Sequence, residues 1–244
     1  MIELISVSKS YPGGQQALRG VDLRVPEAST LALLGSSGCG KTTTLRLINR
    51  LIDPSSGQVR VGGRDVQSLD PIELRRGIGY VVQEAGLFPH RTALENVETV
   101  PRLLGWSASR RRRRCEELFS LAGLDFETHS DRYPNQLSGG ERQRVGLARA
   151  LAADPPVVLM DEPFAALDAI TRSQLQQHFL DLKDELGKTM VLVTHDVDEA
   201  LTLADQVALI VDGRIALIGT PDELRAAPPD SPIAAFLGDR RARS

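Results

Sequence analysis

The sequence has few aromatic residues, few cysteines and no long apolar run. Phe, Trp and Tyr make up 4% of the 244 residues, and Cys39 and Cys115 show neither metal-binding spacing nor a disulfide framework. Two such cysteines favour a reducing compartment. The longest apolar runs, such as LALL and VVLM, fall far short of the roughly 20 residues that cross a bilayer, so any membrane contact must be indirect.

An excess of charge of either sign is also missing. The formal net charge is −3, and charged residues are 25% of the chain. This balance argues against a disordered tail and against a surface built for polyanions, so we expect no nucleic-acid partner. The N-terminal residues lack a basic leader followed by an apolar segment, so we expect no signal peptide. A chain of this length can bury a core without disulfides.

Short apolar segments separated by turn residues predict a layered α/β fold. Residues 3–11, 17–25 and 30–34 read as strands, helical spacing runs from Leu45 to Ile52, and residues 58–66 predict a hairpin around Gly62-Gly63. Further along, the runs at 157–160, 189–194 and 207–211 have the continuous apolar character of parallel strands buried on both faces.

Two local signals predict a turn and a helix start near the C-terminal end. Asp212-Gly213 between apolar runs predicts a hairpin, and Thr220 with Pro221 and Glu223 predicts a capped helix. Residues 87–150 have a helical texture instead. We therefore expect one domain over 1–244, with a mixed, mostly parallel core and an N-terminal antiparallel β subdomain from 1–86 and 151–244, and an inserted α-helical subdomain at 87–150.

The segment GSSGCGKT, residues 35–42, follows an apolar strand and precedes a helical pattern, as a P-loop does. Glycines let the backbone amides wrap phosphate, Lys41 supplies charge to the outer phosphates, and Thr42 offers a hydroxyl to Mg²⁺. The predicted ATP-binding residues here are Gly35, Ser36, Ser37, Gly38, Cys39, Gly40, Lys41, Thr42 and Thr43.

Cys39 within this loop and Tyr11 near the N-terminus carry separate predictions. Cys39 lies among amides that would also stabilise a thiolate, so we expect alkylation to inactivate the protein and ATP to protect it. Tyr11 precedes the turn Pro12-Gly13-Gly14, where its ring could stack on adenine. The alternative for Tyr11 is an ordinary tyrosine at a strand end.

Two acidic residues end the strand at 157–160. Asp161 would hold Mg²⁺, directly or through water, and Glu162 would act as general base on the attacking water. The alternative is a pair of solvated acids at a strand end. Because general-base catalysis contributes about 10²–10⁴-fold, loss of Glu162 should raise the barrier by roughly 3–5 kcal/mol while sparing ATP binding.

Two further residues follow predicted strands. His195 comes after 189–194 and could contact the γ-phosphate or the attacking water, although it could equally cap the next helix. Gln83 follows the apolar run IGYVV, and its amide could ligate Mg²⁺ and report nucleotide occupancy.

The segment LSGGE, residues 137–141, combines a helix start with exposed backbone. Ser138 and Glu141 have the spacing of a capping box. Gly139 and Gly140 would leave the first amides of that helix uncovered and able to approach an anion. A capping box alone is common, so this segment predicts a phosphate contact only in the company of the other motifs.

An arginine run, Arg110 to Arg114, precedes another helical pattern. Its simplest interpretation is the solvated first turns of a helix capped near Ser107 or Ser109. An acidic partner or a lipid headgroup is the alternative, since five cations oppose the macrodipole at a helix N-terminus.

The order of these motifs resembles that of the ATP-binding subunits of ABC transporters over nearly the whole length. In that family the P-loop and the signature turn of opposite protomers sandwich ATP, so Ser138, Gly139, Gly140 and Glu141 would face the nucleotide of a partner protomer. The resemblance also implies a D-loop at Ala165, Ala166, Leu167 and Asp168. Two positions depart from the usual pattern: Ala165 replaces Ser or Gly, and Glu141 replaces Gln.

A closer resemblance is to importers of glycine betaine, choline and related quaternary-amine osmoprotectants. It is carried by LFPHRTALENVETVPRLLGW, DRYPNQLSGGERQRVGLARALAADPP and PFAALDAITR. It implies a homodimeric ATPase on the cytoplasmic face of the membrane, bound peripherally to permease subunits and served indirectly by a substrate-binding protein. The docking site would lie near Gln83 and the apolar Leu87, Phe88 and Pro89. We expect no C-terminal CBS modules.

Other functions stay open on the sequence alone. The importer could carry another small solute, such as an amino acid. A soluble ABC ATPase acting on nucleic acid or ribosomes generally needs a coiled-coil or zinc-bearing insertion or two ATPase halves, none of which is recognisable here. A regulatory module without turnover is disfavoured by the presence of both Glu162 and His195.

Overall fold

The computed structural model describes residues 1–244 except 84, 166, 229–230, 232, 234–235 and 237–244; for 182, 184 and 185 it describes the backbone only. The chain divides into two compact units. The first unit comprises Met1–Leu74 and Thr189–Ser244, and the second comprises Arg75–Lys188. The predicted helical subdomain at 87–150 falls inside the second unit.

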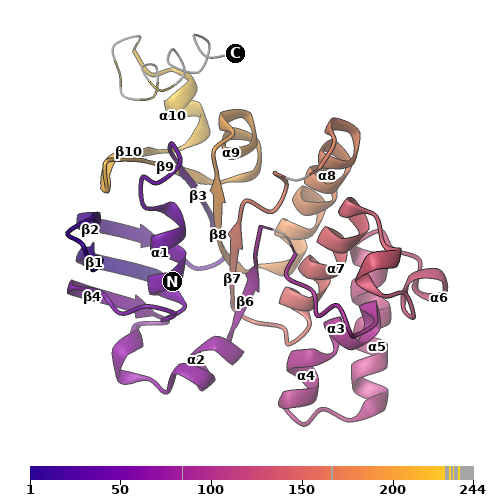
Figure 1. Cartoon of the computed structure of the whole chain (residues 1–244). Helices are drawn as coiled ribbons and strands as arrows, with labels where there is room; N and C mark the ends of the chain where they lie inside the picture. Colours follow the sequence, from indigo (N-terminus) through magenta and orange to yellow (C-terminus); the bar gives the residue numbers. More distant parts are fainter. Residues whose placement is uncertain (84, 166, 229–230, 232, 234–235, 237–244) are drawn as a thin grey trace. The chain divides into compact units, whose positions relative to one another are not determined.

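The first unit contains an antiparallel sheet with the strand order β2-β1-β4-β5 (Figure 1). Its strands are β1 (Ile2–Ser10), β2 (Gln16–Val25), β4 (Ser56–Val61) and β5 (Arg64–Asp65). The predicted hairpin around Gly62-Gly63 is the connection between β4 and β5, which pair antiparallel. The antiparallel sheet predicted for the N-terminal part is therefore confirmed.

The first unit also holds the strand that leads into the P-loop. In it, β3 (Thr30–Leu34) pairs in parallel with both β8 (Thr189–Thr194) and β9 (Gln206–Val211). Every residue of β3 and β8 is buried, as their continuous apolar sequences predict. β9 turns back into β10 (Arg214–Gly219) at Asp212 and Gly213, whose φ values of 47° and 76° are those of the predicted two-residue hairpin.

Helices cover this parallel sheet. α9 (Val197–Leu203) and α10 (Pro221–Arg225) share a core with β3 and β9, which includes Leu34, Ala200, Leu209 and Leu224. As predicted, Thr220 and Glu223 form a capping box at the start of α10.

α1 (Lys41–Ile48) is shorter than its apolar spacing predicts. The chain leaves the helix at Arg50, which has φ 47°. Leu51 N donates to Arg46 O at 2.8 Å and Arg50 N donates to Leu47 O at 3.1 Å, the two bonds of a Schellman motif. The expected continuation to Ile52 is wrong because a non-glycine residue occupies the left-handed position that ends the helix. The short η1 (Val66–Ser68) and α2 (Pro71–Arg76) follow β4 and β5.

The second unit consists of two parallel strands and a group of helices. β6 (Ile78–Val81) pairs with β7 (Val157–Asp161). A Cβ on Gly79 of β6 would lie 2.4 Å from Ala150 O, so a glycine is needed for α7 to pack this closely against the strand. The helices are α3 (Ala93–Val97), α4 (Thr99–Leu103), α5 (Ala108–Leu121), α6 (Phe126–His129), η2 (Pro134–Gln136), α7 (Gly139–Leu151) and α8 (Ala169–Leu186).

None of the helices formed by the described residues is both long enough and apolar enough to cross a bilayer.

Candidate nucleotide-binding site

The P-loop connects β3 to α1 in the first unit. Gly40 occupies the N-cap of α1 with φ 116°, and no side chain caps the helix. A Cβ on Gly40 would lie 2.6 Å from both Ala17 O and Leu18 Cδ2, because β2 passes against the loop. Only glycine fits this position, and the uncapped first turn of α1 presents its amides to an anion.

Lys41 brings positive charge into the loop. It is 6% exposed, and its Nζ donates to Gly35 O at 2.7 Å and to Ser36 O at 2.9 Å. Ser36, Ser37 and Gly38 form the exposed side of the loop, and Gly38 adopts φ 79° with nothing within 4 Å of the place where a Cβ would be. The predicted phosphate-binding residues thus form one contiguous loop with an ammonium group at its centre.

Cys39 is buried in this loop with an exposure of 6%. Burial raises the pKa of its thiol, and the nearby Lys41 ammonium only partly opposes that increase. The loop amides do favour a thiolate, as expected, but desolvation of the charged form outweighs them and the net pKa shift is upward.

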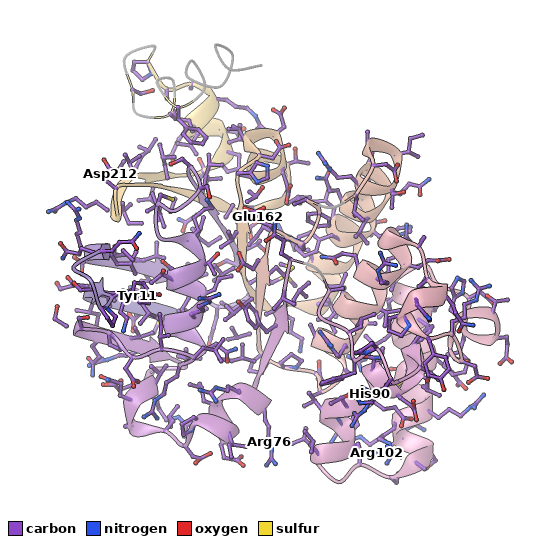
Figure 2. All side chains as sticks on the ribbon, in the orientation of Figure 1. Tyr11, Arg76, His90, Arg102, Glu162 and Asp212 are labelled. Atoms are coloured by element: carbon purple, nitrogen blue, oxygen red, sulfur yellow. The ribbon has the colours of Figure 1, made fainter. Side chains whose placement is uncertain are left out.

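Tyr11 lies beside the start of α1. Its hydroxyl is 3.4 Å from Thr43 Oγ1, and its backbone closes the turn through the Tyr11 N to Gln15 O bond of 2.9 Å. Figure 2 labels this residue on the first unit. The structure brings Tyr11 to the P-loop, where its ring could contact the base of a bound nucleotide.

His195 follows β8 at the same sheet edge as the P-loop. Leu34 and Thr194 are register partners in the parallel pair of β3 and β8, so the residues after them leave the sheet together. His195 is exposed. Asp196 caps α9 by accepting from Asp198 N at 3.0 Å and Glu199 N at 3.3 Å, so the alternative in which His195 caps that helix is wrong.

In the second unit, the end of β7 carries the two predicted acids. Asp161 and Glu162 are half-buried. Val81 pairs with Met160, so the loops after β6 and β7 leave the same edge of the pair. There Gln83 Nε2 donates to Glu162 Oε2 at 3.3 Å. The structure thus joins the predicted general base to the predicted sensor.

Glu162 has an unusual backbone conformation, with φ 47° (its side chain is labelled in Figure 2). A non-glycine residue pays about 1–2 kcal/mol for the left-handed region. Such strain is concentrated at functional sites. The positive φ therefore supports a functional role for Glu162 over the alternative of a solvated acid at a strand end.

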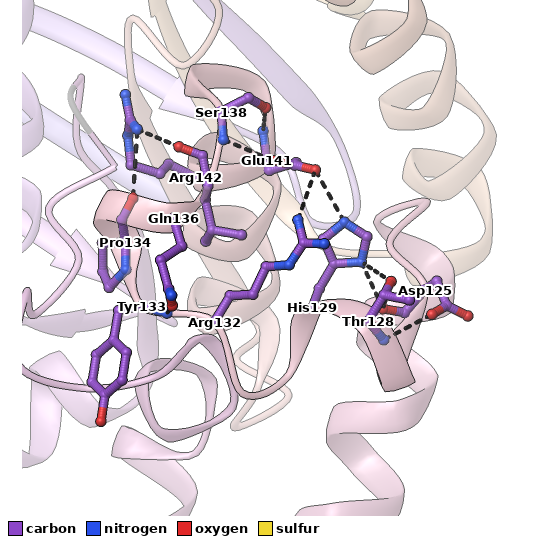
Figure 3. A network of polar contacts seen from close by, with 11 residues as sticks. Asp125, Thr128, His129, Arg132, Tyr133, Pro134, Gln136, Ser138, Glu141 and Arg142 are labelled. Carbon is purple, nitrogen blue, oxygen red and sulfur yellow. Dashed lines mark hydrogen bonds and ion pairs between the residues drawn. The ribbon is translucent and has the colours of Figure 1, made fainter.

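The signature turn, residues 137–141, begins α7 with the predicted capping box (Figure 3). Ser138 N donates to Glu141 Oε2 at 2.7 Å, and Glu141 N donates to Ser138 Oγ at 3.2 Å. These bonds lower the pKa of the Glu141 carboxyl, the bond from the Ser138 amide most of all.

The two glycines of the turn differ. A Cβ on Gly139 would have only Arg142 Nη2 nearby, at 3.9 Å, whereas a Cβ on Gly140 would lie 2.5 Å from Thr171 Cγ2. Gly139 leaves the first turn of α7 open, and Gly140 lets α7 pack against α8.

Comparison with known proteins identifies the family. The family model described as ABC transporter matches residues 18–165. The chain belongs to the ABC transporter family. It is 49% identical to the glycine betaine/carnitine/choline transport ATP-binding protein OpuCA of Bacillus subtilis over 99% of this chain, and spans 63% of that relative's length.

Two other matches support the family and the fold. The osmoprotectant import ATP-binding protein OsmV of Salmonella typhimurium is 49% identical over 99% of this chain and 64% of its own length. The dimeric ATP-binding cassette MJ0796, solved in a post-hydrolysis state with ADP and Pi, matches with a TM-score of 0.82 and 38% identity, covering 91% of this chain and 99% of that one. The predicted α/β fold of an ABC ATPase is thus confirmed.

The segment predicted to be the D-loop leads into α8. Asp168 caps α8 by accepting from Ile170 N at 3.1 Å and Thr171 N at 3.0 Å. The pKa of Asp168 is lowered, chiefly by the hydrogen bond from the Thr171 side chain. Ala165 is half-buried and Leu167 is buried, whereas Ala166 lies outside the described residues.

The arginine run of the chain is held by intramolecular partners. Ser107 caps α5, as one of the two predicted positions requires. Arg111 pairs with Glu98 at 3.1 Å, Arg112 pairs with Glu116 at 2.9 Å, and Arg110 lies 3.5 Å from the centroid of Trp106. These contacts favour the structural interpretation of the run over a lipid or acidic partner.

Sequence reasoning missed the residues that shape the loop after Gln83. Buried Asn96 accepts from Phe88 N at 2.7 Å and donates to Phe88 O at 3.2 Å, while Arg149 donates to Ala85 O and Gly86 O at 2.7 Å each. Arg149 is 63 and 64 residues away in sequence from the two carbonyls that it binds, whereas Asn96 lies eight residues from Phe88. The buried polar Asn96 within the run TALENV was the one local signal available.

Proposed function

We propose that this chain is the ATP-hydrolysing subunit of an importer, and that two copies close around two ATP molecules to drive transport. Glu162 carries the hydrolysis part of the proposal. It follows β7, adopts φ 47° and accepts a hydrogen bond from Gln83, so a movement of Gln83 on nucleotide binding would also move the proposed base. A module that only binds nucleotide has no need for a strained carboxylate there.

The chemical steps divide among the residues already described. The P-loop amides and Lys41 bind and orient the phosphates, and Glu162 accepts a proton from the attacking water. His195 contacts the γ-phosphate or that water, and Tyr11 packs on the adenine.

Mg²⁺ fits the oxygen-bearing side chains of this chain. Thr42, Gln83 and Asp161 offer a hydroxyl, an amide and a carboxylate, the hard oxygen ligands that this ion prefers. Because the Gln83 amide nitrogen contacts Glu162, its amide oxygen is the atom that could ligate a cation. Within the described part of the chain, no cluster of three or more His, Cys, Asp or Glu could hold a metal ion. The ion would neutralise charge on the phosphates.

Substitution of Glu162→Gln tests the hydrolytic role. We expect turnover to fall by about 10²–10⁴-fold, while binding of a fluorescent ATP analogue is retained and an ATP-bound dimer accumulates. The Lys41→Ala variant is the matched control, since it should lose nucleotide binding as well. If Glu162→Gln hydrolysed ATP at the original rate, Glu162 would not be the base.

Two copies of the chain would form each ATP site. Ser138, Gly139, Gly140 and Glu141 would face the nucleotide bound at Lys41 of the partner, and Asp168 would lie near the same contact. A Ser138→Ala or a Lys41→Ala chain alone should be inactive, whereas a mixture of the two can rebuild at most one complete site. Full activity of the Ser138 variant by itself would exclude this sharing.

The transported solute is inferred from the relatives. OpuCA and OsmV are named for transport of glycine betaine, carnitine, choline and osmoprotectants, and we propose the same solute class here. Uptake of labelled glycine betaine or choline by cells that carry this chain with its permease tests the assignment. No uptake of either compound, with uptake of an amino acid instead, would move the proposal to another importer class.

The permease contact would lie at the loop after Gln83, at the cytoplasmic face of the membrane, with a substrate-binding protein acting through the permease. Phe88 is 40% exposed, and Arg91 and Arg149 lie 5.0 and 6.0 Å from its ring centroid. Phe88→Asp should abolish uptake while the isolated chain still hydrolyses ATP. Unchanged uptake would rule out this docking site.

A further inference from the structure

The side chain of Glu141 makes a second set of contacts that the capping box does not require. Its Oε2 accepts a hydrogen bond from the Ser138 backbone amide. Its Oε1 accepts from His129 Nε2 at 3.0 Å and lies 3.9 Å from Arg132 Nη1 (Figure 3). The side chains of His129 and Glu141 are 15% and 28% exposed. One carboxylate therefore links the N-terminus of α7 to α6 and to the segment that follows it.

The other ring nitrogen of His129 also faces an oxygen acceptor. His129 Nδ1 lies 2.7 Å from Asp125 O and 2.8 Å from Thr128 Oγ1, inside its own helical turn. The turn is itself fixed, because Asp125 Oδ1 accepts from Thr128 N at 2.9 Å. The imidazole is thus held between a carbonyl on one side and the Glu141 carboxylate on the other.

This geometry suits a ring that carries two protons. A neutral imidazole has one N–H. With that proton on Nε2 the ring donates to Glu141 Oε1, and its bare Nδ1 can accept from the Thr128 hydroxyl but gives no donor to Asp125 O. A protonated ring donates to both and adds a positive charge beside the carboxylate. Protonation of His129 therefore tightens the contact that holds Glu141 in place.

Charged and titratable groups from several elements surround the ring, including His178 of α8, whose Nδ1 lies 3.2 Å from Arg144 Nη1. Glu141 and Arg144 come from α7, and Arg132 comes from the segment after α6. The Asp125 carboxylate caps α6, and from α5 Arg112 lies 5.1 Å from the centroid of Phe126 on the same short helix.

We propose that His129 is a positioning residue for the signature turn: through Glu141 it holds Ser138 and the open amides of α7 in the geometry that receives the partner's ATP, more firmly when protonated. This inference rests on the proposed function, in which those amides bind nucleotide across a dimer. Arg132 supports the same carboxylate from the other side at the longer distance.

The test uses the full chain with Glu162→Gln, so that ATP is bound but not consumed. Two quantities are measured from about pH 6 to about pH 8, the range in which an ordinary imidazole titrates. Binding of a fluorescent ATP analogue at low protein concentration reports the P-loop alone. The dissociation constant of the dimer at saturating ATP, from sedimentation, reports the signature turn.

We expect dimer affinity to fall by roughly three- to tenfold as pH rises, since a partly exposed charge-assisted hydrogen bond is lost. His129→Gln keeps one donor but cannot titrate, so its dimer affinity should lose this component of the pH dependence. His129→Ala should weaken the dimer at low pH by a similar factor without weakening ATP binding at low protein concentration. The exposed His90, changed to Gln, is the matched control and should keep the original pH profile.

Glu141→Gln provides the coupling test. In that background His129→Ala should change dimer affinity by less than about twofold, because the carboxylate through which it acts is gone. An equal effect in both backgrounds, or an unchanged pH profile in His129→Gln, would overturn the proposal. If His129→Ala lowers the melting temperature, its dimer affinity is not used, and the pH profile of His129→Gln alone tests the proposal. If ATP drives no dimerisation of the chain that keeps His129, the proposed ATP-bound dimer is wrong, and this outcome is distinct from a dimer that forms without dependence on His129.

Discussion

The two glycines of the signature turn should respond oppositely to the same substitution. Both lie in the first turn of α7, and neither has a positive φ. Alanine is the better helix former at both positions by roughly 0.5–1 kcal/mol, so helix propensity alone predicts a small stabilisation in each case. The surroundings of the added methyl group separate them.

At Gly140 the new Cβ would lie 2.5 Å from Thr171 Cγ2. Thr171 cannot simply rotate away, because its side chain bonds to the Asp168 carboxylate that caps α8. Relief of the overlap requires α7 and α8 to shift, and overpacking of this kind costs about 1–3 kcal/mol. At Gly139 the nearest atom is the end of a flexible arginine at 3.9 Å, so the fold should be unaffected.

Thermal unfolding followed by circular dichroism measures the difference. Gly140→Ala should lower the melting temperature by about 2–4 °C for each kcal/mol lost, and Gly139→Ala should leave it unchanged or slightly raised. Thr171→Ser removes the Cγ2 methyl while keeping the hydroxyl, so Gly140→Ala with Thr171→Ser should recover most of the loss. Equal melting temperatures for the two single variants would refute the packing argument.

The same pair separates stability from nucleotide contact. Gly139→Ala should fold normally yet reduce ATP-driven dimerisation, because the methyl group covers amides that the partner's phosphates would approach. Normal dimerisation of Gly139→Ala would show that these amides are not the phosphate contact, whatever the outcome for Gly140.

Three further outcomes follow from the contacts described above. Arg111→Ala should lower the free energy of unfolding by about 1–3 kcal/mol, because the side chains of Arg111 and Glu98 are only 15% and 14% exposed. Arg112→Ala should lower it by less than about 0.5 kcal/mol, because the side chains of Arg112 and Glu116 are 59% and 46% exposed. Equal losses in urea titrations would contradict this expectation. Burial raises the pKa of the Cys39 thiol, and it raises the pKa of the Cys115 thiol to about 12. Alkylation of the native chain, measured by mass spectrometry, should therefore be slow at neutral pH, become faster as pH rises and modify Cys39 before Cys115. Rapid labelling at neutral pH would count against this. The fold lowers the pKa of the Glu141 carboxyl, so its contribution to stability is present above the pKa of the unfolded state and is lost as pH falls through the pKa of the folded state. In Glu141→Gln, the free energy of unfolding should therefore fall less steeply with pH below about pH 4.5. An unchanged pH dependence of that free energy would argue against this.

Local signals in the sequence predicted local structure well. Ser138 with Glu141, Thr220 with Glu223, and Asp212-Gly213 each form the cap or turn that their residue types favour, because such motifs are closed by hydrogen bonds within a few residues. The strands of the core were equally accessible, since their apolar runs are buried along their whole length.

Two kinds of feature could not be predicted from the sequence: an unusual residue at a helix end, and contacts between residues that are far apart along the chain. The end of α1 at Ile48 was missed because Arg50, not a glycine, takes the left-handed position. The burial that raises the pKa of Cys39 comes from packing around the loop rather than from its amides. The packing of Gly140 on Thr171 and the contact of His129 with Glu141 join residues from separate helices, so neither has a local pattern.

If Glu162 is the general base, as we propose, its positive φ means that the residue needed for catalysis is also one that lowers the stability of the fold. Glycine adopts this conformation without the roughly 1–2 kcal/mol that an L-residue pays, so replacement of Glu162 by glycine should relieve backbone strain. A search for thermostable variants by melting temperature alone would thus be drawn to this site and would return chains that bind ATP and no longer consume it. Any stabilised version of this protein therefore needs selection for turnover alongside selection for heat resistance.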